Sequence, residues 1–117
     1  AYEGLLALPG VGAYTAAAIA SFAFDLPHAV LDGNVFRVLS RYLGIDTPVD
    51  TTEGRKCFAA SARAALDVAN PAAYNQAIMD FGAMVCTPQS PQCGACPLQT
   101  HCAAFRQQRV AGLPVKS

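Results

Sequence analysis

Charged side chains are scarce in this sequence. They make up 14% of its 117 residues, and eight basic residues balance eight acidic ones, so the formal net charge is zero. Ordinary globular domains carry roughly 25% charged residues. The balance excludes a protein that holds nucleic acid through a broad positive field, although backbone amides and single basic side chains remain available. The low fraction of charged residues fits a protein with a compact apolar core, or a segment of a larger fold.

Long apolar runs are also missing. The Ala-rich stretch 13–23 has about half the roughly 20 residues that a transmembrane helix needs. We therefore expect no membrane partner, and no secretory signal is visible. The start, AYEGLLALPG, has neither an initiator Met nor a helix cap, which favours a segment of a longer protein.

Strand-like alternation and internal repeats are absent, and helical patterns take their place. Four stretches have helical composition and spacing: 13–24, 33–44, 51–66 and 70–86. Gly44 is a stop signal for the second helix and Thr51 a cap for the third. Asn70 is predicted to cap the fourth, with Pro71 at its first position. The sequence therefore predicts an all-α fold.

The C-terminal stretch differs from these helices. Residues 106–117, RQQRVAGLPVKS, have no amphipathic stripe and contain a Gly-Leu-Pro sequence. We expect this tail to begin a linker and not to contribute to the core.

Four of the five cysteines lie in one Pro-rich loop with the spacing C-x6-C-x2-C-x5-C. They are Cys86, Cys93, Cys96 and Cys102. Two unstrained disulfides are hard to form among thiols this close. Structural zinc sites usually have two C-x2-C knuckles and only one is present, whereas iron–sulfur clusters accept more varied spacing. Zinc and iron–sulfur both remain open from spacing alone. Cys57 is interpreted as a small core residue.

The stretch LPGVGAYTA, residues 8–16, breaks one helix and starts another. Gly10 and Gly12 permit positive φ and close backbone approach. The free amides at the start of the next helix can then hold a phosphate group. An ordinary tight turn between packed helices is the alternative interpretation.

Asp32 directly follows an apolar triplet and directly precedes a helix, in VLDGNVFRVL. Its position predicts an N-cap that accepts backbone amides of the first turn. A capped carboxylate is rigid and ionised, so it also suits the stabilisation of the positive sugar that forms when a glycosidic bond breaks.

Together the cysteine loop behind MDFGAMVC, the hairpin and the VLDGNVFRVLSR turn resemble the adenine DNA glycosylases of the endonuclease III helix–hairpin–helix superfamily. The resemblance implies a partial helical lobe followed by a 4Fe–4S cluster loop. Residues 1–85 would form the helical segment, with the hairpin at 8–16 and the catalytic turn at 30–36. Residues 86–102 would form the cluster loop, and residues 103–117 the tail and the start of an interdomain linker.

The resemblance also assigns residues. The cluster ligands would be Cys86, Cys93, Cys96 and Cys102. The DNA contacts would be Leu8, Gly10, Val11, Gly12, Thr15, Arg37 and Arg41, although the two arginines could equally form a solvated helix face. The loop between the first two cysteines lacks Lys and Arg, which makes Arg106 and Arg109 further candidates for phosphate contacts.

For the chemistry, the resemblance implies that Asp32 is the catalytic carboxylate and that Asn34 orients it. Ordinary hydrogen bonding at the start of the helix is the alternative role of Asn34. Tyr14 occupies the position at which lyase members carry a nucleophilic lysine. A phenol cannot form a Schiff base, so we expect a monofunctional enzyme.

The reaction implied is hydrolytic excision of adenine paired with oxidised guanine or guanine in duplex DNA, by a monomer inside the cell. A glutamate that protonates adenine would lie upstream of this chain, because Glu3 is too close to the hairpin, and a recognition domain would follow it. We expect the isolated chain to lack useful activity. The alternatives are a glycosylase for oxidised pyrimidines or thymine mismatches, and a non-catalytic 4Fe–4S DNA-binding module.

Overall fold

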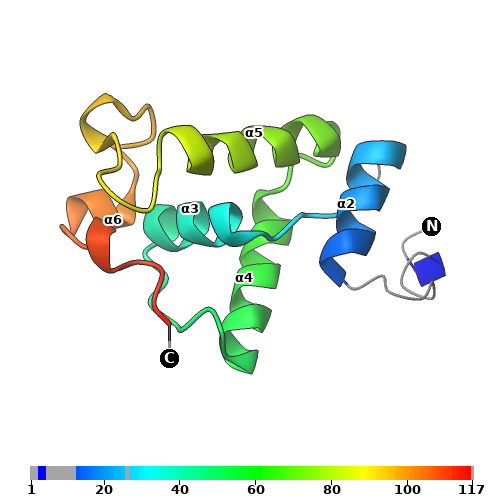
Figure 1. Cartoon of the computed structure of the whole chain (residues 1–117), viewed down its shortest axis with the longest axis horizontal. Helices are drawn as coiled ribbons and strands as arrows, with labels where there is room; N and C mark the ends of the chain where they lie inside the picture. The colour runs from blue at the N-terminus through cyan, green and yellow to red at the C-terminus, as the bar shows by residue number, and fades with distance from the viewer. Residues whose placement is uncertain (1–2, 5–12, 26, 117) are drawn as a thin grey trace.

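The computed structural model describes residues 3–4, 13–25 and 27–116, and within these ranges its regular elements are all helical (Figure 1). The longer helices are α2 (Ala13–Phe24), α3 (Gly33–Leu43), α4 (Thr52–Ala65) and α5 (Pro71–Met84). Three short ones follow: η1 (Cys93–Ala95), α6 (Ala103–Arg106) and η2 (Val110–Gly112). The all-α prediction is confirmed.

Helix α3 lies in the middle of the molecule. It packs against α5, α4 and α6, while α2 packs against α5. Figure 1 shows α5 running along one side of α3, α4 crossing it, and the cysteine loop beyond its C-terminal end. The N-terminal end of α3 therefore faces the helices α2, α4 and α5, and its other end faces the loop.

The core forms where α3 meets α4. Val35 and Leu39 of α3 pack with Phe58 and Ala62 of α4, and all four are buried. The ring of Phe36 meets that of Phe58 edge-on, with centroids 5.2 Å apart and an interplanar angle of 77°. Edge-to-face aromatic pairs contribute about 0.5–1.5 kcal/mol beyond their buried area. This packing fixes the orientation of α3.

The helix ends follow the sequence signals with one exception. Thr51 caps α4 by accepting from the amide of Gly54 at 3.0 Å, and Gly44 ends α3 in the left-handed region with φ +71°. Asn70 occupies the predicted N-cap position of α5 and Pro71 begins the helix, but the Asn70 side chain makes no cap hydrogen bond and instead donates to Asp67. The carboxylate of Asp25, at the end of α2, accepts from the amide of Ala72 at 3.1 Å.

The C-terminal tail packs against the helices instead of leaving them. Leu113 is 3% exposed, and the carbonyl of Val115 accepts from the amide of Val49 at 2.9 Å. The expectation that the tail contributes nothing to the core is therefore wrong. Its apolar positions follow no long helical period because the tail contains only the short helix η2 and packs through single residues such as Leu113.

Among the residues that the structure describes, no helix is long and apolar enough to cross a membrane.

Candidate active site and metal centre

The turn before α3 holds Asp32 in a fixed position. Its backbone is extended, with φ −106° and ψ −177°, and its Oδ1 accepts from the amide of Val35 at 2.8 Å. The predicted N-cap is confirmed. The carboxylate is half-buried, next to the exposed Gly33. A carboxylate held by backbone amides at a helix N-terminus is rigid, and its negative charge is favoured there.

Asn34 and Arg37 extend this arrangement away from the turn. The Nδ2 of Asn34 lies 3.4 Å from the Oδ2 of Asp32, within donating distance. The Oδ1 of the same amide accepts from Nη2 of Arg37 at 2.7 Å. The amide of Asn34 is therefore oriented from both sides, with its donor end toward the carboxylate.

Arg37 joins this site to the end of α5. Its Nη2 also donates to the carbonyl of Gly82 at 2.7 Å, and its Nε donates to the carbonyl of Cys86 at 2.8 Å. A continuous set of hydrogen bonds thus runs from the first cysteine of the loop to the carboxylate of Asp32.

The groups around Arg37 shift the pKa of its guanidinium in opposite directions. Burial lowers the pKa of its guanidinium, and the positive charge of Arg41 lowers that pKa further. Negative charge at Cys86 and Asp32 raises it. Arginine stays protonated at physiological pH in spite of such shifts. The Nε and Nη2 atoms of Arg37 already donate to groups within the protein. The DNA contact expected of Arg37 therefore stays a prediction.

Gly82 allows α5 to approach the start of α3 closely. A Cβ added there would lie 2.9 Å from both the Cβ and the backbone oxygen of Asn34. Real side chains almost never make such contacts, so any larger residue would displace Asn34 or α5. The absence of a side chain at this position therefore determines where Asn34 lies.

Several predicted site residues lie outside what the structure describes. Leu8, Gly10, Val11 and Gly12 fall in the range 5–12, and the side chains of Tyr14 and Thr15 are not described either. The backbone of α2 does begin at Ala13, directly after the second hairpin glycine. This boundary agrees with the helix predicted from residue 13.

The four cysteines of the loop line one cavity. Apolar residues of α3, α5 and α6, including Val38, Phe81 and Phe105, form its other walls, and the empty space is about 410 Å³, part of it open to solvent. Burial raises the pKa of the Cys93 thiol, and the other three cysteines raise it further. The structure therefore brings all four predicted ligands together in one apolar place.

Arg41 is the residue that fastens this loop. It is 2% exposed, and its Nε donates to the carbonyls of Val110 and Leu113, both at 3.1 Å. Its Nη1 and Nη2 donate to the carbonyls of Thr87 and Pro88, at 2.6 and 3.2 Å. The predictions that Arg41 contacts phosphate or lies on a solvated helix face are both wrong, because its guanidinium is enclosed by carbonyl groups of the chain.

Sulfur completes the surroundings of Arg41. Its Nη1 donates to the Sγ of Cys86 at 3.4 Å, and the Cys102 thiol reaches its backbone carbonyl at 3.5 Å. The amide of Leu98 donates to the Sγ of Cys96, also at 3.4 Å. Hydrogen-bond donors beside sulfur atoms are the kind of contact that metal-bound thiolates accept.

These features fit an iron–sulfur cluster. Such clusters are held by four thiolates, and their stability depends on hydrogen bonds to sulfur and on a dry environment. Within the described ranges, no three His, Cys, Asp or Glu side chains form a group arranged to hold a metal ion. The four cysteines nevertheless line one apolar cavity, which agrees with four thiolate ligands in a dry environment.

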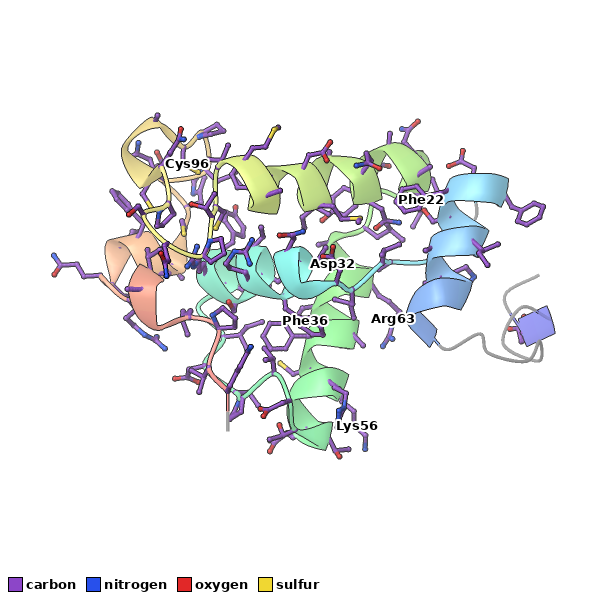
Figure 2. The ribbon with its side chains drawn as sticks, viewed as in Figure 1. Phe22, Asp32, Phe36, Lys56, Arg63 and Cys96 are labelled. Carbon is purple, nitrogen blue, oxygen red and sulfur yellow. The ribbon has the colours of Figure 1, made fainter. Side chains whose placement is uncertain are left out.

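The active-site turn and the cysteine loop are separate places. Figure 2 shows Asp32 at the start of α3, and Cys96 in the loop beyond the opposite end of the helix. No cysteine takes part in the hydrogen bonds of Asp32. The loop therefore supports the helix that carries the carboxylate without contacting the carboxylate itself.

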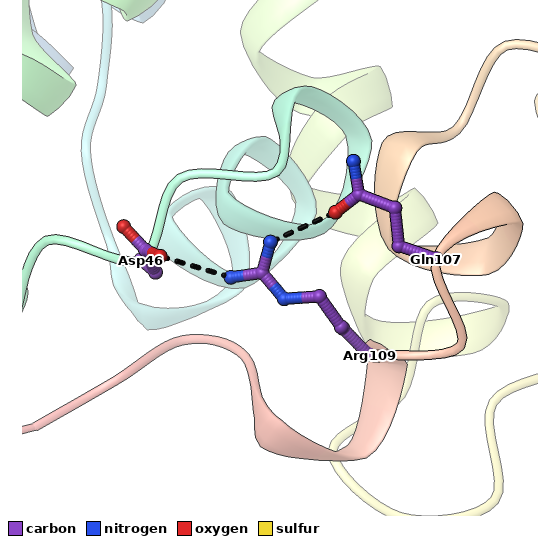
Figure 3. Close-up of polar contacts among 3 residues, drawn as sticks. All are labelled: Asp46, Gln107 and Arg109. Atoms are coloured by element: carbon purple, nitrogen blue, oxygen red, sulfur yellow. Dashed lines mark hydrogen bonds and ion pairs between the residues drawn. The ribbon is translucent and has the colours of Figure 1, made fainter.

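Arg109, one of the further candidates for a phosphate contact, has protein partners on the surface. Its Nη2 pairs with Asp46 at 3.2 Å and its Nη1 donates to Gln107 at 2.8 Å (Figure 3). Exposed ion pairs contribute only about 0–1 kcal/mol. A phosphate could replace Asp46 at little cost, so this contact stays a prediction, as does that of Arg106, which is exposed.

Two functional features were missed by sequence reasoning. Neither Gly82 nor Asn75 is singled out by the sequence, although Asn75 is 1% exposed and bonded to three groups. A buried asparagine in a helix is a weak signal in one sequence, because its partners lie 45–54 positions away.

Two family models match the chain. Residues 86–102 match the iron–sulfur binding domain of endonuclease III, and residues 1–22 match the helix–hairpin–helix motif. The first match covers the four cysteines that line the cavity. The cofactor prediction is confirmed by it.

Curated relatives agree with these matches. The chain is 43% identical over 103 residues to the adenine DNA glycosylase of Schizosaccharomyces pombe, covering 88% of this chain and 22% of the relative. Identity to the adenine DNA glycosylase of Homo sapiens is 48% over 103 residues, covering 88% and 18%. The relative from Mycolicibacterium smegmatis is 43% identical over 114 residues, covering 96% and 36%. The chain thus spans about a fifth to a third of these relatives.

Solved structures give the same result for the fold. A thermostable thymine-DNA glycosylase superposes with a TM-score of 0.82 and 31% identity, over 92% of this chain and 49% of that one. Endonuclease III in a non-covalent DNA complex superposes with a TM-score of 0.68 and 30% identity, over the same shares. The chain therefore corresponds to a segment of the adenine DNA glycosylases, with the helix–hairpin–helix motif and the iron–sulfur domain of the endonuclease III superfamily.

Proposed function

We propose that this chain is the central part of a monofunctional adenine DNA glycosylase. Its substrate is duplex DNA with adenine opposite oxidised guanine or guanine, and it acts as a monomer inside the cell. The observation that carries the proposal is the carboxylate of Asp32, held at the start of α3 by the amide of Val35 and by Asn34. The identity of 43–48% to adenine DNA glycosylases supports adenine as the base removed.

The chain's own residues have defined parts in the reaction. The base is flipped out of the duplex while the hairpin 8–16 holds the backbone through amides. Asp32 stabilises the positive charge that develops on the sugar as the glycosidic bond breaks, and water then adds to the sugar. Asn34 keeps the carboxylate in place. A glutamate upstream of this chain protonates the departing adenine, which is a poor leaving group without general acid help.

The cysteine loop binds a 4Fe–4S cluster through Cys86, Cys93, Cys96 and Cys102. Hydrolysis transfers no electrons, so we assign the cluster a structural and DNA-positioning role. Replacement of Cys96 by Ser should therefore reduce folding or DNA affinity before it changes the chemistry on bound substrate.

The test uses the full-length protein that contains this chain, and a duplex with adenine opposite oxidised guanine. Asp32→Asn should abolish base release while the dissociation constant for the duplex stays close to that of the wild type. Asp46→Asn is the matched control, because Asp46 is exposed and pairs only at the surface with Arg109. Unchanged base release by the Asp32→Asn protein would contradict the proposal, and would favour a non-catalytic DNA-binding module.

A thymine-mismatch glycosylase is the second candidate, because the chain superposes on the thymine-DNA glycosylase with a TM-score of 0.82. Fold similarity alone does not set the substrate, and identity to this relative is lower, at 31%. A duplex with thymine opposite guanine in the same assay distinguishes the two. Strand cleavage should be absent with either duplex, because Tyr14 cannot form a Schiff base.

A further inference from the structure

Asn75 is a buried polar residue on α5 with partners in two other segments. It is 1% exposed. Its Oδ1 accepts from the amide of Val30 at 3.2 Å, and its Nδ2 donates to the carbonyl of His28 at 2.9 Å and to the hydroxyl of Ser21 at 2.7 Å. The amide group thus uses its acceptor and both of its donors, the full set that a primary amide offers apart from one further lone pair.

The first two partners belong to the segment that leads into the active-site turn. The amide of Val30 and the carbonyl of His28 lie on either side of Ala29, and Asp32 follows two positions after Val30. Val30 is itself 1% exposed. This segment has no helix of its own, so Asn75 supplies hydrogen bonds that hold its backbone in place.

The third partner belongs to α2. Ser21 is fully buried and lies in the helix that begins directly after the predicted phosphate-binding hairpin. One amide group therefore ties the segment before Asp32 to this helix. In Figure 1, α2 and the N-terminal half of α5 lie next to each other, at the end of α3 that carries the turn.

No other side chain can satisfy all three partners in this orientation. A flipped amide would place a donor against the Val30 amide, and an aspartate would place an acceptor against the His28 carbonyl. An apolar replacement would leave an amide, a carbonyl and a hydroxyl without partners in a dry site.

We propose that Asn75 is a positioning residue, which sets the place of the Asp32 carboxylate relative to α2 and the hairpin that grips the DNA backbone. This inference rests on the proposed glycosylase function. The hairpin fixes the DNA and Asp32 must meet the sugar of the same DNA, so their separation decides whether the carboxylate faces the reacting carbon. A misplacement of about 1 Å can reduce a rate roughly 100-fold.

The experiment compares variants of the full-length protein in single-turnover excision of adenine opposite oxidised guanine. Active sites are counted separately by titrating each variant with the duplex, and the rate constant is measured with active enzyme in excess, so it refers to correctly folded molecules only. Asn75→Leu removes all three bonds, and Asn75→Asp keeps the acceptor for Val30 but loses the two donors. We expect both to slow base release roughly 10- to 100-fold per active site, with duplex affinity unchanged within error.

Ser21→Ala tests the link to α2 separately, and it keeps the proposal falsifiable if the Asn75 variants do not fold. It removes one bond and leaves the segment 28–30 attached to Asn75. We expect a smaller but measurable loss of rate, again without loss of affinity. Gln76→Ala is the control and should behave as wild type, because the exposed side chain of Gln76 donates to Asp80 on the same helix.

Each outcome is decisive. A wild-type rate per active site, with only a smaller active fraction or a lower melting temperature, would mean that Asn75 merely stabilises the fold and would overturn the inference. A loss of duplex affinity at an unchanged rate would also overturn it. If the wild-type protein releases no adenine, the proposed function fails and the inference with it. Normal wild-type activity beside normal Asn75 variants rejects the inference alone.

Discussion

Arg41 places a full positive charge inside the protein, surrounded by dipoles and sulfur. In the part of the chain that the structure describes, no carboxylate forms an ion pair with it. Four carbonyl groups and the Sγ of Cys86 accept its hydrogen bonds. A buried charge is tolerated when it is fully hydrogen-bonded, and the thiolates of the bound cluster add compensating negative charge.

Replacement of Arg41 by Leu should prevent stable cluster binding. It leaves the carbonyl oxygens of Thr87, Pro88 and Leu113 without donors, whereas that of Val110 keeps the amide of Leu113. Each buried unsatisfied group costs about 1–3 kcal/mol. Iron and sulfide content of the purified protein, and its visible absorbance, measure the effect. Arg63→Leu on α4 is the control, because Arg63 is exposed and lies away from the loop (Figure 2). Normal iron content in the Arg41→Leu protein would contradict this account.

Replacement of Arg37 by Ala should slow adenine release in the full-length protein. It removes the donor that orients the amide of Asn34, and it detaches the start of α3 from the carbonyls of Gly82 and Cys86. We expect a decrease of roughly 10- to 100-fold in the single-turnover rate. Titration of labelled duplex shows whether affinity falls as well, which would indicate the additional phosphate contact that remains a prediction.

At the scale of the helices, the sequence predicts a helix end correctly where the capping residue and the backbone group that it binds lie within one helical turn. Asp32, Thr51 and Gly44 mark helix ends in the sequence, because each acts on backbone groups three or four residues away. Asn70 lies at the N-cap of α5 as predicted, but the carboxylate that accepts from the first turn of this helix is that of the distant Asp25. Contacts of that range depend on how helices pack, and one sequence does not contain that information.

The candidate site likewise contains residues that the sequence indicates and one whose surroundings it does not indicate. The carboxylate of Asp32 and the four cysteines could be identified from motifs. The burial of Arg41 could not, because its partners lie up to 72 positions away and are backbone carbonyls, which any residue carries. Its position in a helical pattern resembles that of a solvated arginine until the tail packs over it.

Gly82→Ala should disturb the start of α3. An added Cβ would meet Asn34 at 2.9 Å, and overpacking of this kind costs about 1–3 kcal/mol, against a gain of about 1 kcal/mol in helix propensity. We expect lower stability in a urea titration and slower base release. Gly112→Ala is the control, because nothing lies within 4 Å of a Cβ added there. A variant at Gly82 that is as stable and active as wild type would show that α5 can shift freely.

At the scale of the whole molecule, α3 carries the carboxylate at one end and supports the metal centre with the other. Core packing on α4 and close contact with α5 keep this helix straight between the two. Damage to the loop can therefore reach the active site through the position of one rigid helix, without any contact between cysteine and carboxylate.

The isolated chain of 117 residues should release no adenine at a useful rate, whereas the full-length protein should. It spans about a fifth of the first curated relatives, and general acid help to the departing base contributes roughly 10²–10⁴-fold. Both proteins are compared on the same duplex with adenine opposite oxidised guanine. Robust base release by the isolated chain would show that it contains its own acid.

The bonds of Arg41 have a further consequence for the assembly of the cluster. Its guanidinium joins carbonyls just after the first cysteine, at Thr87 and Pro88, to carbonyls beyond the last one, at Val110 and Leu113. The chain between them is thus a ring that the side chain of Arg41 closes in the folded protein. Closing a segment of this length costs about 3 kcal/mol of chain entropy. Arg41, and not the cysteine ligands alone, therefore meets the entropic cost of closing the loop that holds the cluster.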